Sequence, residues 1–228
     1  MFDVVDLGTK QGGALNTFFA TAGAVYLKPE VMKSFKKSKS IGFERQEGEK
    51  YRKDVEKKGF NFEIANLATD EAVALLPVSK VYLAWHFLEH LPNKEWSEKL
   101  VKAALTKSTV MAWFRLPSFE QDDITGEGVL RKLGLRFTWT NWHGHSSHWL
   151  VQDCVDAIRD WESQQERKFN LTIRPAGYIK TTSDKRVVPI DTPVDVNAYQ
   201  PAHGYKPIIY FKQAVVAEWE VIVRFACE

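Results

Sequence analysis

The sequence of 228 residues predicts an α/β fold, a doubly wound, mostly parallel sheet that ends in an antiparallel C-terminal hairpin. Two observations lead to this prediction. In the first half, short apolar runs alternate with longer segments of helix-forming residues, and that order implies parallel strands joined by right-handed crossovers. In the last quarter, strand-like segments dominate. The hydrophobic content of 44% and charged content of 26% suit one domain, residues 1–228, with a packed core.

The first half alternates strand and helix throughout. Residues 80–85 are apolar without interruption, as in a strand buried on both faces, whereas residues 60–64 alternate apolar and polar. Pro29 and Gly59 each mark the end of a helical segment. The predicted strands are 2–7, 40–43, 60–64, 80–85 and 109–114, and the predicted helices are 14–28, 46–58, 69–76 and 93–107.

The second half has a different character. A helix is predicted over 151–161, and residues 188–207 contain four prolines without periodicity, which indicates a long loop. Further elements are predicted as a helix over 124–133 and strands over 136–142, 171–173, 177–181, 208–212 and 217–225.

Composition excludes several classes of protein. The net charge of +2 is too small to indicate a nucleic-acid or membrane partner by itself. No apolar run approaches the ~20 residues that span a bilayer, and the first residues lack the basic and apolar regions of a secretory signal. Cys154 and Cys227 are too far apart in the sequence to match the spacing of a zinc-binding motif or of a redox-active cysteine pair. We therefore expect a cytoplasmic protein without a membrane partner.

Two strand ends carry residues suited to a nucleotide-like ligand. Small residues between Asp6 and Gly13 lie in the turn from the first strand to the first helix, where the backbone can approach a ligand and helix N–H groups are free. Glu44 follows the second strand, where an acid can accept both hydroxyls of a ribose. The separation between Asp6 and Glu44 exceeds the roughly 20 residues of the nicotinamide fingerprint, so a dehydrogenase fits poorly.

Histidines form the second pattern. Five of the six fall in two groups, His86 with His90, and His143 with His145 and His148. His86, Glu89 and His90 are three and four residues apart, so one helical turn would point them in one direction. If the second group folds back onto the first, the site offers ligands for Zn²⁺, Fe²⁺ or Mn²⁺. The favoured interpretation is nevertheless metal-free, with histidines lining a substrate pocket and one acting as a base near neutral pH.

On these residues the sequence resembles the class I S-adenosylmethionine-dependent methyltransferases, over residues 4–161. The matching segments are Asp6-Leu7-Gly8 with Gly12-Gly13, Ile41-Gly42-Phe43-Glu44, Asn66-Leu67 and Trp85-His86-Phe87-Leu88-Glu89-His90-Leu91-Pro92. Residues 218–223 look like the antiparallel last strand of that Rossmann-like fold. The first turn departs from the usual glycine spacing by one residue, with Thr9-Lys10-Gln11 in place of small residues.

The resemblance implies an enzyme that transfers a methyl group from S-adenosylmethionine to an O or N acceptor, most simply a small molecule. Residues 1–115 would form the cofactor-binding half and residues 116–228 the substrate-side half. The implied cofactor-binding residues are Asp6, Gly8, Thr9, Gly12, Gly13, Glu44, Arg45, Asn66, Leu67 and Trp85. The implied catalytic residues are His86, Glu89, His90, His143 and His145.

Three rival functions stay open. Residues 86–90 and 143–149 are similar in spacing to the metal-binding segments of methyltransferases that act on the 2′-hydroxyl of small RNAs, with His86 where a Glu would stand. That similarity implies metal-assisted RNA 2′-O-methylation, with RNA as the partner and a divalent metal as a further cofactor. The second rival is a catalytically degenerate binding subunit with this fold, and the third is a doubly wound protein that binds a different nucleotide. The sequence indicates neither the acceptor nor the oligomeric state.

Overall fold

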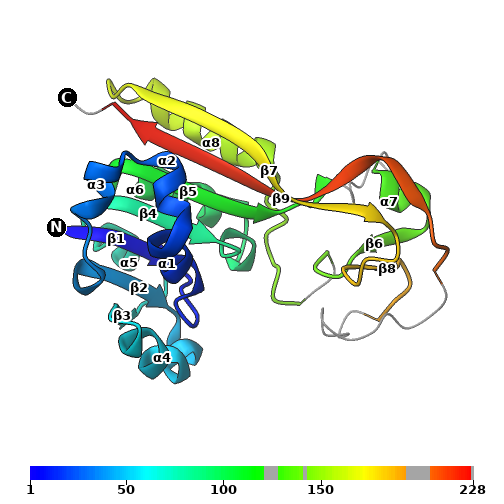
Figure 1. Cartoon of the computed structure of the whole chain (residues 1–228), viewed down its shortest axis with the longest axis horizontal. Helices are drawn as coiled ribbons and strands as arrows, with labels where there is room; N and C mark the ends of the chain where they lie inside the picture. The colour runs from blue at the N-terminus through cyan, green and yellow to red at the C-terminus, as the bar shows by residue number, and fades with distance from the viewer. Residues whose placement is uncertain (121–127, 141–142, 194–205, 227–228) are drawn as a thin grey trace.

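A computed structural model describes residues 1–120, 128–140, 143–193 and 206–226 (Figure 1). One seven-stranded sheet runs through it in the order β3-β2-β1-β4-β5-β9-β7. Strands β1 to β5 are parallel, and β9 pairs antiparallel with both β5 and β7. The strands are β1 (Phe2–Leu7), β2 (Ser40–Glu44), β3 (Asn61–Ile64), β4 (Ser79–Trp85), β5 (Ser108–Pro117), β7 (Phe169–Thr181) and β9 (Tyr210–Phe225). The predicted fold class is confirmed.

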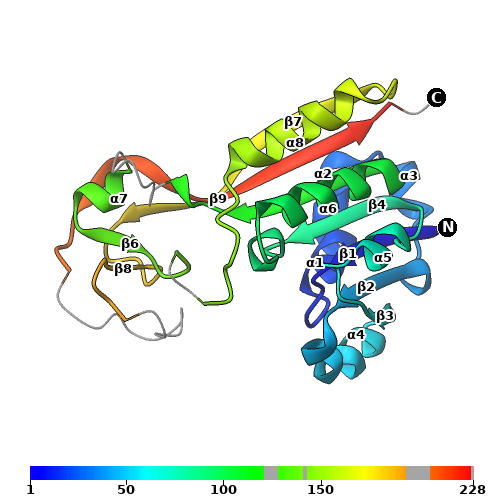
Figure 2. The same ribbon diagram turned by 180° about the vertical axis from the view of Figure 1, so that it is seen from behind.

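Helices cover both faces of the sheet (Figures 1 and 2). One face carries α1 (Gly13–Thr17), the π-helical turn η1 (Phe18–Ala22), α2 (Gly23–Tyr26) and α3 (Pro29–Lys33). The other carries α5 (Asp70–Ala74), α6 (Lys94–Lys107) and α8 (Val151–Ser163). Shorter elements are η2 (Lys37–Lys39), η3 (Gln46–Tyr51), α4 (Arg52–Lys57), η4 (Leu88–His90) and α7 (Val129–Lys132).

The longest helix shows how sequence sets packing. Asn93 caps α6 because its side chain accepts a hydrogen bond from the Trp96 N–H at 3.0 Å. Leu100, Ala104 and Leu105 face the sheet and are fully buried. They belong to the larger of two clusters that sandwich the sheet, which fixes the strands and therefore the positions of the loops at their carboxyl ends.

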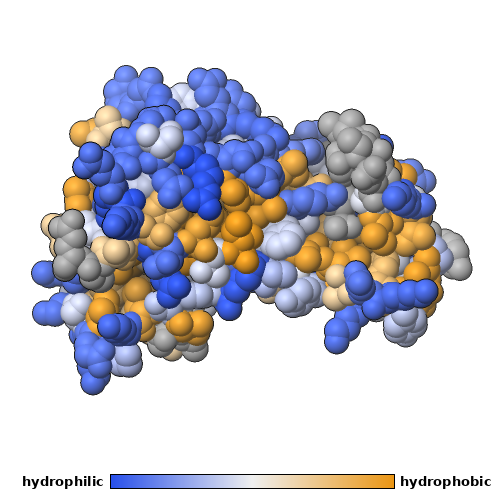
Figure 3. Space-filling view, turned by 90° about the horizontal axis from the view of Figure 1, so that it is seen from above, coloured by the Kyte–Doolittle hydropathy of each residue, from blue (hydrophilic) through white to orange (hydrophobic). Residues whose placement is uncertain are grey.

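A smaller lobe projects from the main body (Figures 1 and 2). The C-terminal half of β7 and the N-terminal half of β9 enter it and pack against a separate two-stranded sheet of β6 (Leu135–Phe137) and β8 (Val187–Pro189). Its own core contains Leu130, Leu135, Phe137, Ile179, Val187, Val215 and Ala217. On the face in Figure 3, hydrophobic residues gather toward the centre of the molecule and on this lobe.

Several predicted boundaries in the second half differ from the structure. The strands predicted over 171–173 and 177–181 form one strand, β7, and those over 208–212 and 217–225 form β9. Register shifts around Gly177 bend β7 and β9 from the main sheet into the small lobe. The apolar and polar alternation of the sequence is interrupted there, and the prediction therefore ended the strands too early.

The remaining differences concern shorter stretches. The strand predicted over 136–142 is β6, which ends at Phe137, and the helix predicted over 124–133 is α7. Val188 and Pro189 lie in β8, although the sequence predicted a loop over 188–207. The remainder of these predictions at 124–127, 141–142 and 194–205 lies outside the described residues. None of the helices that the structure describes has the length and apolar character needed to cross a membrane.

Candidate functional site

A cavity of about 340 Å³ opens at the carboxyl ends of β1, β2, β3 and β4. Five of the predicted cofactor-binding residues line it: Gly8, Glu44, Arg45, Asn66 and Leu67. Its other lining residues are Lys10, Glu47, Gly48, Lys50, Tyr51, Ala65, Ala68, Phe87, His90, Leu91 and Pro92. The turn after β1 and the acid after β2 therefore share one cavity at the edge of the sheet where ligands of such folds bind.

The turn after β1 depends on glycine. Gly8 has a φ of 75°, a left-handed conformation that L side chains rarely adopt, and its N–H donates to the Phe43 carbonyl at 2.9 Å. A Cβ on Gly8 would lie 2.2 Å from the ring of Phe87. Gly12 has a φ of 72° and caps α1. At Gly8 the cavity wall therefore consists of main-chain atoms, and the side chain of Phe87 packs against Gly8.

Glu44 is fixed at the cavity wall by the backbone around it. Its carboxylate accepts hydrogen bonds from the N–H groups of Lys10 at 2.9 Å and Arg45 at 3.1 Å. A Cβ on Gly48 would lie only 1.8 Å from the Cγ of Glu44. Gly48 was not predicted as a site residue, because nothing in its sequence context indicates that it supports Glu44.

The other predicted cofactor-binding residues are not among those that line the cavity. Thr9 packs beneath it, where a Cβ on Gly42 would lie 2.6 Å or less from the Thr9 side chain. Gly13 is exposed at the start of α1, and no heavy atom lies within 4 Å of a Cβ built on it. The ring of Trp85 packs on Trp113, with centroids 4.8 Å apart, on the side of the sheet covered by α1 to α3.

Asp6 supports the turn from within the protein. Its side chain is 1% exposed, and burial, with a contribution from the Glu44 charge, raises its pKa from 3.8 to about 7, although the Thr9 hydroxyl acts in the opposite direction. Asp6 is therefore a buried acid directly below the glycine turn, close to the cavity but not at its surface.

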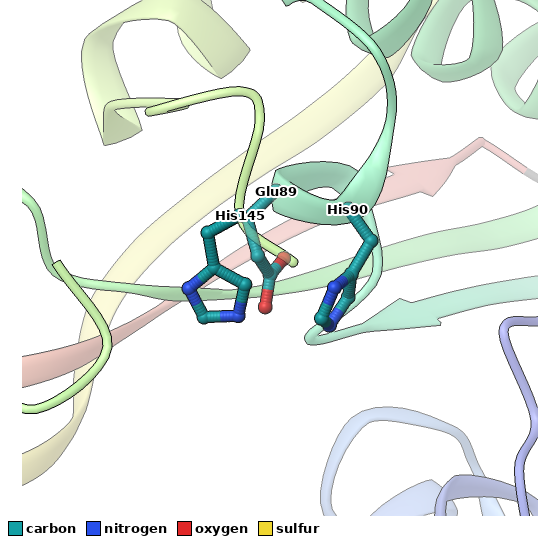
Figure 4. A group of neighbouring side chains, drawn as sticks. All are labelled: Glu89, His90 and His145. Carbon is teal, nitrogen blue, oxygen red and sulfur yellow. The ribbon is translucent and has the colours of Figure 1, made fainter. Parts of the chain in front are cut away.

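Beside the cavity, Glu89, His90 and His145 converge (Figure 4). One ligand atom from each lies within 4.8 Å of the others. The Nδ1 of His90 lies 2.8 Å from the Gly144 carbonyl, and the Nδ1 of His145 lies 2.9 Å from the Trp139 carbonyl. A carbonyl only accepts hydrogen bonds, so each Nδ1 carries the proton and each Nε2 of the neutral ring keeps a lone pair for a ligand.

Burial sets the protonation of this group. It raises the pKa of Glu89 from 4.5 to about 7, against the opposing charge of His86. It lowers the pKa of His90 to about 3 and that of His145 to about 4. Both imidazoles are therefore neutral at pH 7, while Glu89 titrates near neutrality. Such a group has the donor atoms for a divalent metal, and it also places a carboxylate that can take up a proton near neutral pH.

His86 extends the group toward the last strand. It has a φ of 51°, its Nδ1 lies 3.7 Å from Glu89 and its Nε2 lies 3.5 Å from Glu218 on β9. Arg115 on β5 donates to Glu218 from Nε at 2.8 Å. Arg115 and Glu218 were not predicted as site residues, since 103 positions separate them.

The structure does not place all the predicted histidines together. His143 lies on an exposed turn and is not in the three-residue group, and the ring of His148 stacks on Phe119 with centroids 4.7 Å apart.

Comparison with known proteins identifies the fold. No protein-family model and no curated protein sequence matches the chain. It is similar to the solved structure of an S-adenosylmethionine-dependent methyltransferase from Archaeoglobus fulgidus, with 12% identity and a TM-score of 0.56 over 98% of this chain and 86% of that one. An O-methyltransferase family protein from Burkholderia thailandensis gives 9% identity and a TM-score of 0.57 over 98% of this chain, which spans only 50% of that protein.

The methyltransferase domain of bacterial CtHen1 is also similar, with 11% identity and a TM-score of 0.51 over 97% of this chain and 89% of that domain. At these identities the likeness shows the fold. The chain therefore has the fold of S-adenosylmethionine-dependent methyltransferases, as the motifs around Gly8 and Glu44 indicated.

Proposed function

We propose that the protein is an S-adenosylmethionine-dependent methyltransferase that methylates an oxygen or nitrogen of a small molecule. One observation carries the proposal. The Gly8 turn, the Glu44 carboxylate and Asn66 line a single cavity, and His90 connects that cavity to the cluster that contains Glu89. A ligand site and a proton acceptor thus lie side by side.

The cavity suits an adenosyl ligand. Asn66 and Leu67 would hold the adenine, Glu44 the ribose hydroxyls, and the bare backbone at Gly8 the amino-acid end. When bound, S-adenosylmethionine supplies an already activated methyl group. The buried carboxyl of Asp6, with its pKa raised to about 7, would support the turn from below.

The residues beside the cavity would act on the acceptor. Holding the acceptor in line with the methyl donor can lower the activation barrier by roughly 7–11 kcal/mol, so positioning is the main task of the protein. Glu89, whose pKa of about 7 matches neutral pH, would accept the acceptor proton, while the neutral rings of His90 and His145 orient the acceptor. The small lobe, within residues 116–228, would form the substrate side of the site, and residues 1–115 the cofactor side.

Calorimetric titration with S-adenosylmethionine and S-adenosylhomocysteine tests the proposal. We expect saturable binding of both and at least tenfold weaker binding after Glu44→Ala, because about 1.5–3 kcal/mol accompanies each lost hydrogen bond to a charged group. Absence of binding would remove the proposal. Binding of a nicotinamide dinucleotide instead would favour a doubly wound protein of a different class. Binding without methyl transfer to any O or N nucleophile in an acceptor screen would favour a degenerate subunit.

A second candidate function is metal-assisted 2′-O-methylation of RNA. The clustered donor atoms of Glu89, His90 and His145 favour it, and so does the similarity to the methyltransferase domain of CtHen1. If this function holds, Mn²⁺ should raise the melting temperature, a chelator should abolish methyl transfer, and His145→Ala should remove both effects. Indifference to metal and chelator would exclude it.

The cytoplasm is the compartment we propose. Cys154 is buried and unpaired, as in proteins of reducing compartments.

A further inference from the structure

We propose that Lys10 binds the carboxylate at the amino-acid end of the adenosyl ligand, and that it therefore determines which adenosyl compounds the cavity accepts. This inference rests on the proposed function and assigns a role to a residue that departs from the usual glycine-turn pattern.

The backbone holds Lys10 in an uncommon conformation. Its φ is 44°, in the left-handed region that a residue with a side chain adopts rarely. Its N–H donates to Glu44 at 2.9 Å, which ties the residue to the proposed ribose position. Strained residues of this kind persist where the surrounding structure requires their placement, and they concentrate at ligand sites. Lys10 lines the cavity, as do Gly8 and His90.

Charge balance within the cavity distinguishes Lys10 from the other cations. Three basic residues line it. Arg45 lies 3.4 Å from the carboxylate of Glu47, and the ammonium of Lys50 lies 5.0 Å from the centroid of the Tyr51 ring. Within the described part of the chain, the Lys10 ammonium forms no ion pair, side-chain hydrogen bond or ring contact, and the acid that its charge does influence is the buried Glu89, whose pKa it lowers against the larger effect of burial. A cation at a cavity wall that is not ion-paired can bind an anionic group of the ligand.

The position of Lys10 selects the end of the ligand that it meets. In the strand order β3-β2-β1-β4, Asn66 follows β3 on one side of Glu44, and Lys10 follows β1 on the other side, toward the cluster that follows β4. The Lys10 charge reaches that cluster: after the larger effect of burial, it lowers the pKa of His90 and of His145. The amino-acid end of an adenosyl ligand would occupy this side, and its carboxylate is the one anionic group that S-adenosylmethionine carries.

A carboxylate on an acidic acceptor has the same chemistry, so the test must separate the two sources. We favour the cofactor, because Lys10 belongs to the same turn as Gly8 and its N–H bonds to Glu44. The probes are S-adenosylhomocysteine and S-adenosyl-3-thiopropylamine, which is the same molecule without the carboxylate. Calorimetry measures both affinities in the full chain without an acceptor.

Wild-type protein should bind S-adenosylhomocysteine at least about tenfold more tightly than the decarboxylated compound. Lys10→Met should remove this preference by weakening only S-adenosylhomocysteine, and Lys10→Arg should retain most of it. Lys53→Met is the control, because Lys53 is an exposed lysine on α4 that does not line the cavity; it should change neither affinity. Ligand-free melting temperatures establish that all variants are folded.

Three outcomes would overturn the inference. Equal affinity of the wild type for the two compounds means that no residue recognises the carboxylate. Equal weakening of both compounds by Lys10→Met means that Lys10 acts through the shape of the turn. If Lys10→Met changes neither affinity but raises the KM for an acidic acceptor, Lys10 binds the carboxylate of the acceptor and not that of the cofactor. If S-adenosylhomocysteine does not bind at all, the proposed function itself fails, and the two failures are distinguishable.

Discussion

The support that Gly48 gives to Glu44 provides a sharp test of the cavity. A Cβ at position 48 would lie 1.8 Å from the Glu44 Cγ, so Gly48→Ala must displace the Glu44 side chain. Displacement breaks its hydrogen bonds from the Lys10 and Arg45 N–H groups. It also removes the carboxylate from the position proposed for the ribose hydroxyls. Losing one hydrogen bond to a charged group costs about 1.5–3 kcal/mol, which corresponds to a roughly 10- to 100-fold weaker affinity for S-adenosylhomocysteine.

Calorimetry with S-adenosylhomocysteine measures the effect, and Gly13→Ala is a matched control. Gly13 lies at the start of α1, where an added Cβ meets no heavy atom within 4 Å. The affinity of the Gly13→Ala variant for S-adenosylhomocysteine should therefore stay within about twofold of the wild-type value. A thermodynamic cycle makes the test stricter. If Gly48 acts through Glu44, Gly48→Ala should have no further effect on top of Glu44→Ala. Wild-type affinity of Gly48→Ala, or full additivity of the two changes, would refute the reasoning.

Further predictions concern stability and pH. Burial raises the folded-state pKa of Asp6 from 3.8 to about 7, so ionisation of Asp6 lowers the free energy of unfolding as pH rises between these values. Asp6→Asn removes the ionisable group and should therefore raise the melting temperature at pH 8 but not at pH 3. Leu100→Ala should lower the free energy of unfolding by about 2–5 kcal/mol in urea titrations, because Leu100 is 0% exposed in the core beneath α6. Against the effect of burial, His86 and Arg115 lower the pKa of Glu218 from 4.5 to about 2. The ionised Glu218 therefore stabilises the fold above pH 4.5, and this contribution is lost as pH falls toward 2. Glu218→Gln should reduce the change in melting temperature between pH 4.5 and pH 2, and an unchanged pH dependence would contradict the ion pairing.

Local patterns predicted the first half of the fold well. The five parallel strands and the main helices between them follow from periodicity, and the alternation then dictates a parallel sheet. Pro29 was predicted to follow the end of a helix, but it also begins the short helix α3, which the sequence did not predict. The same logic predicted that Gly8 and Glu44 would share a site, because the carboxyl ends of parallel strands meet at one edge. Trp85 shows a limit of this reasoning. It lies at the right strand end, but strand alternation turns its ring toward Trp113 on the face that carries α1 to α3.

The remaining site residues depend on contacts that sequence spacing does not encode. Gly48 matters through its contact with Glu44 across a turn, and Glu218 reaches His86 from a strand near the other end of the chain. The strands of the second half were divided in error, because bulges near Gly177 interrupt a pairing that continues into the small lobe. Such features become visible only after distant strands are paired.

The contribution of β9 has a consequence for biosynthesis. The cavity residues from Gly8 to Pro92 leave the ribosome before Glu218 does, so during synthesis His86 at first lacks one of its two acidic neighbours. The contact between His86 and Glu218 forms only when β9 takes its place between β5 and β7. A chain that ends before residue 218 would keep the residues of the cavity and of the cluster, but it would lack the acid that pairs with His86 and Arg115.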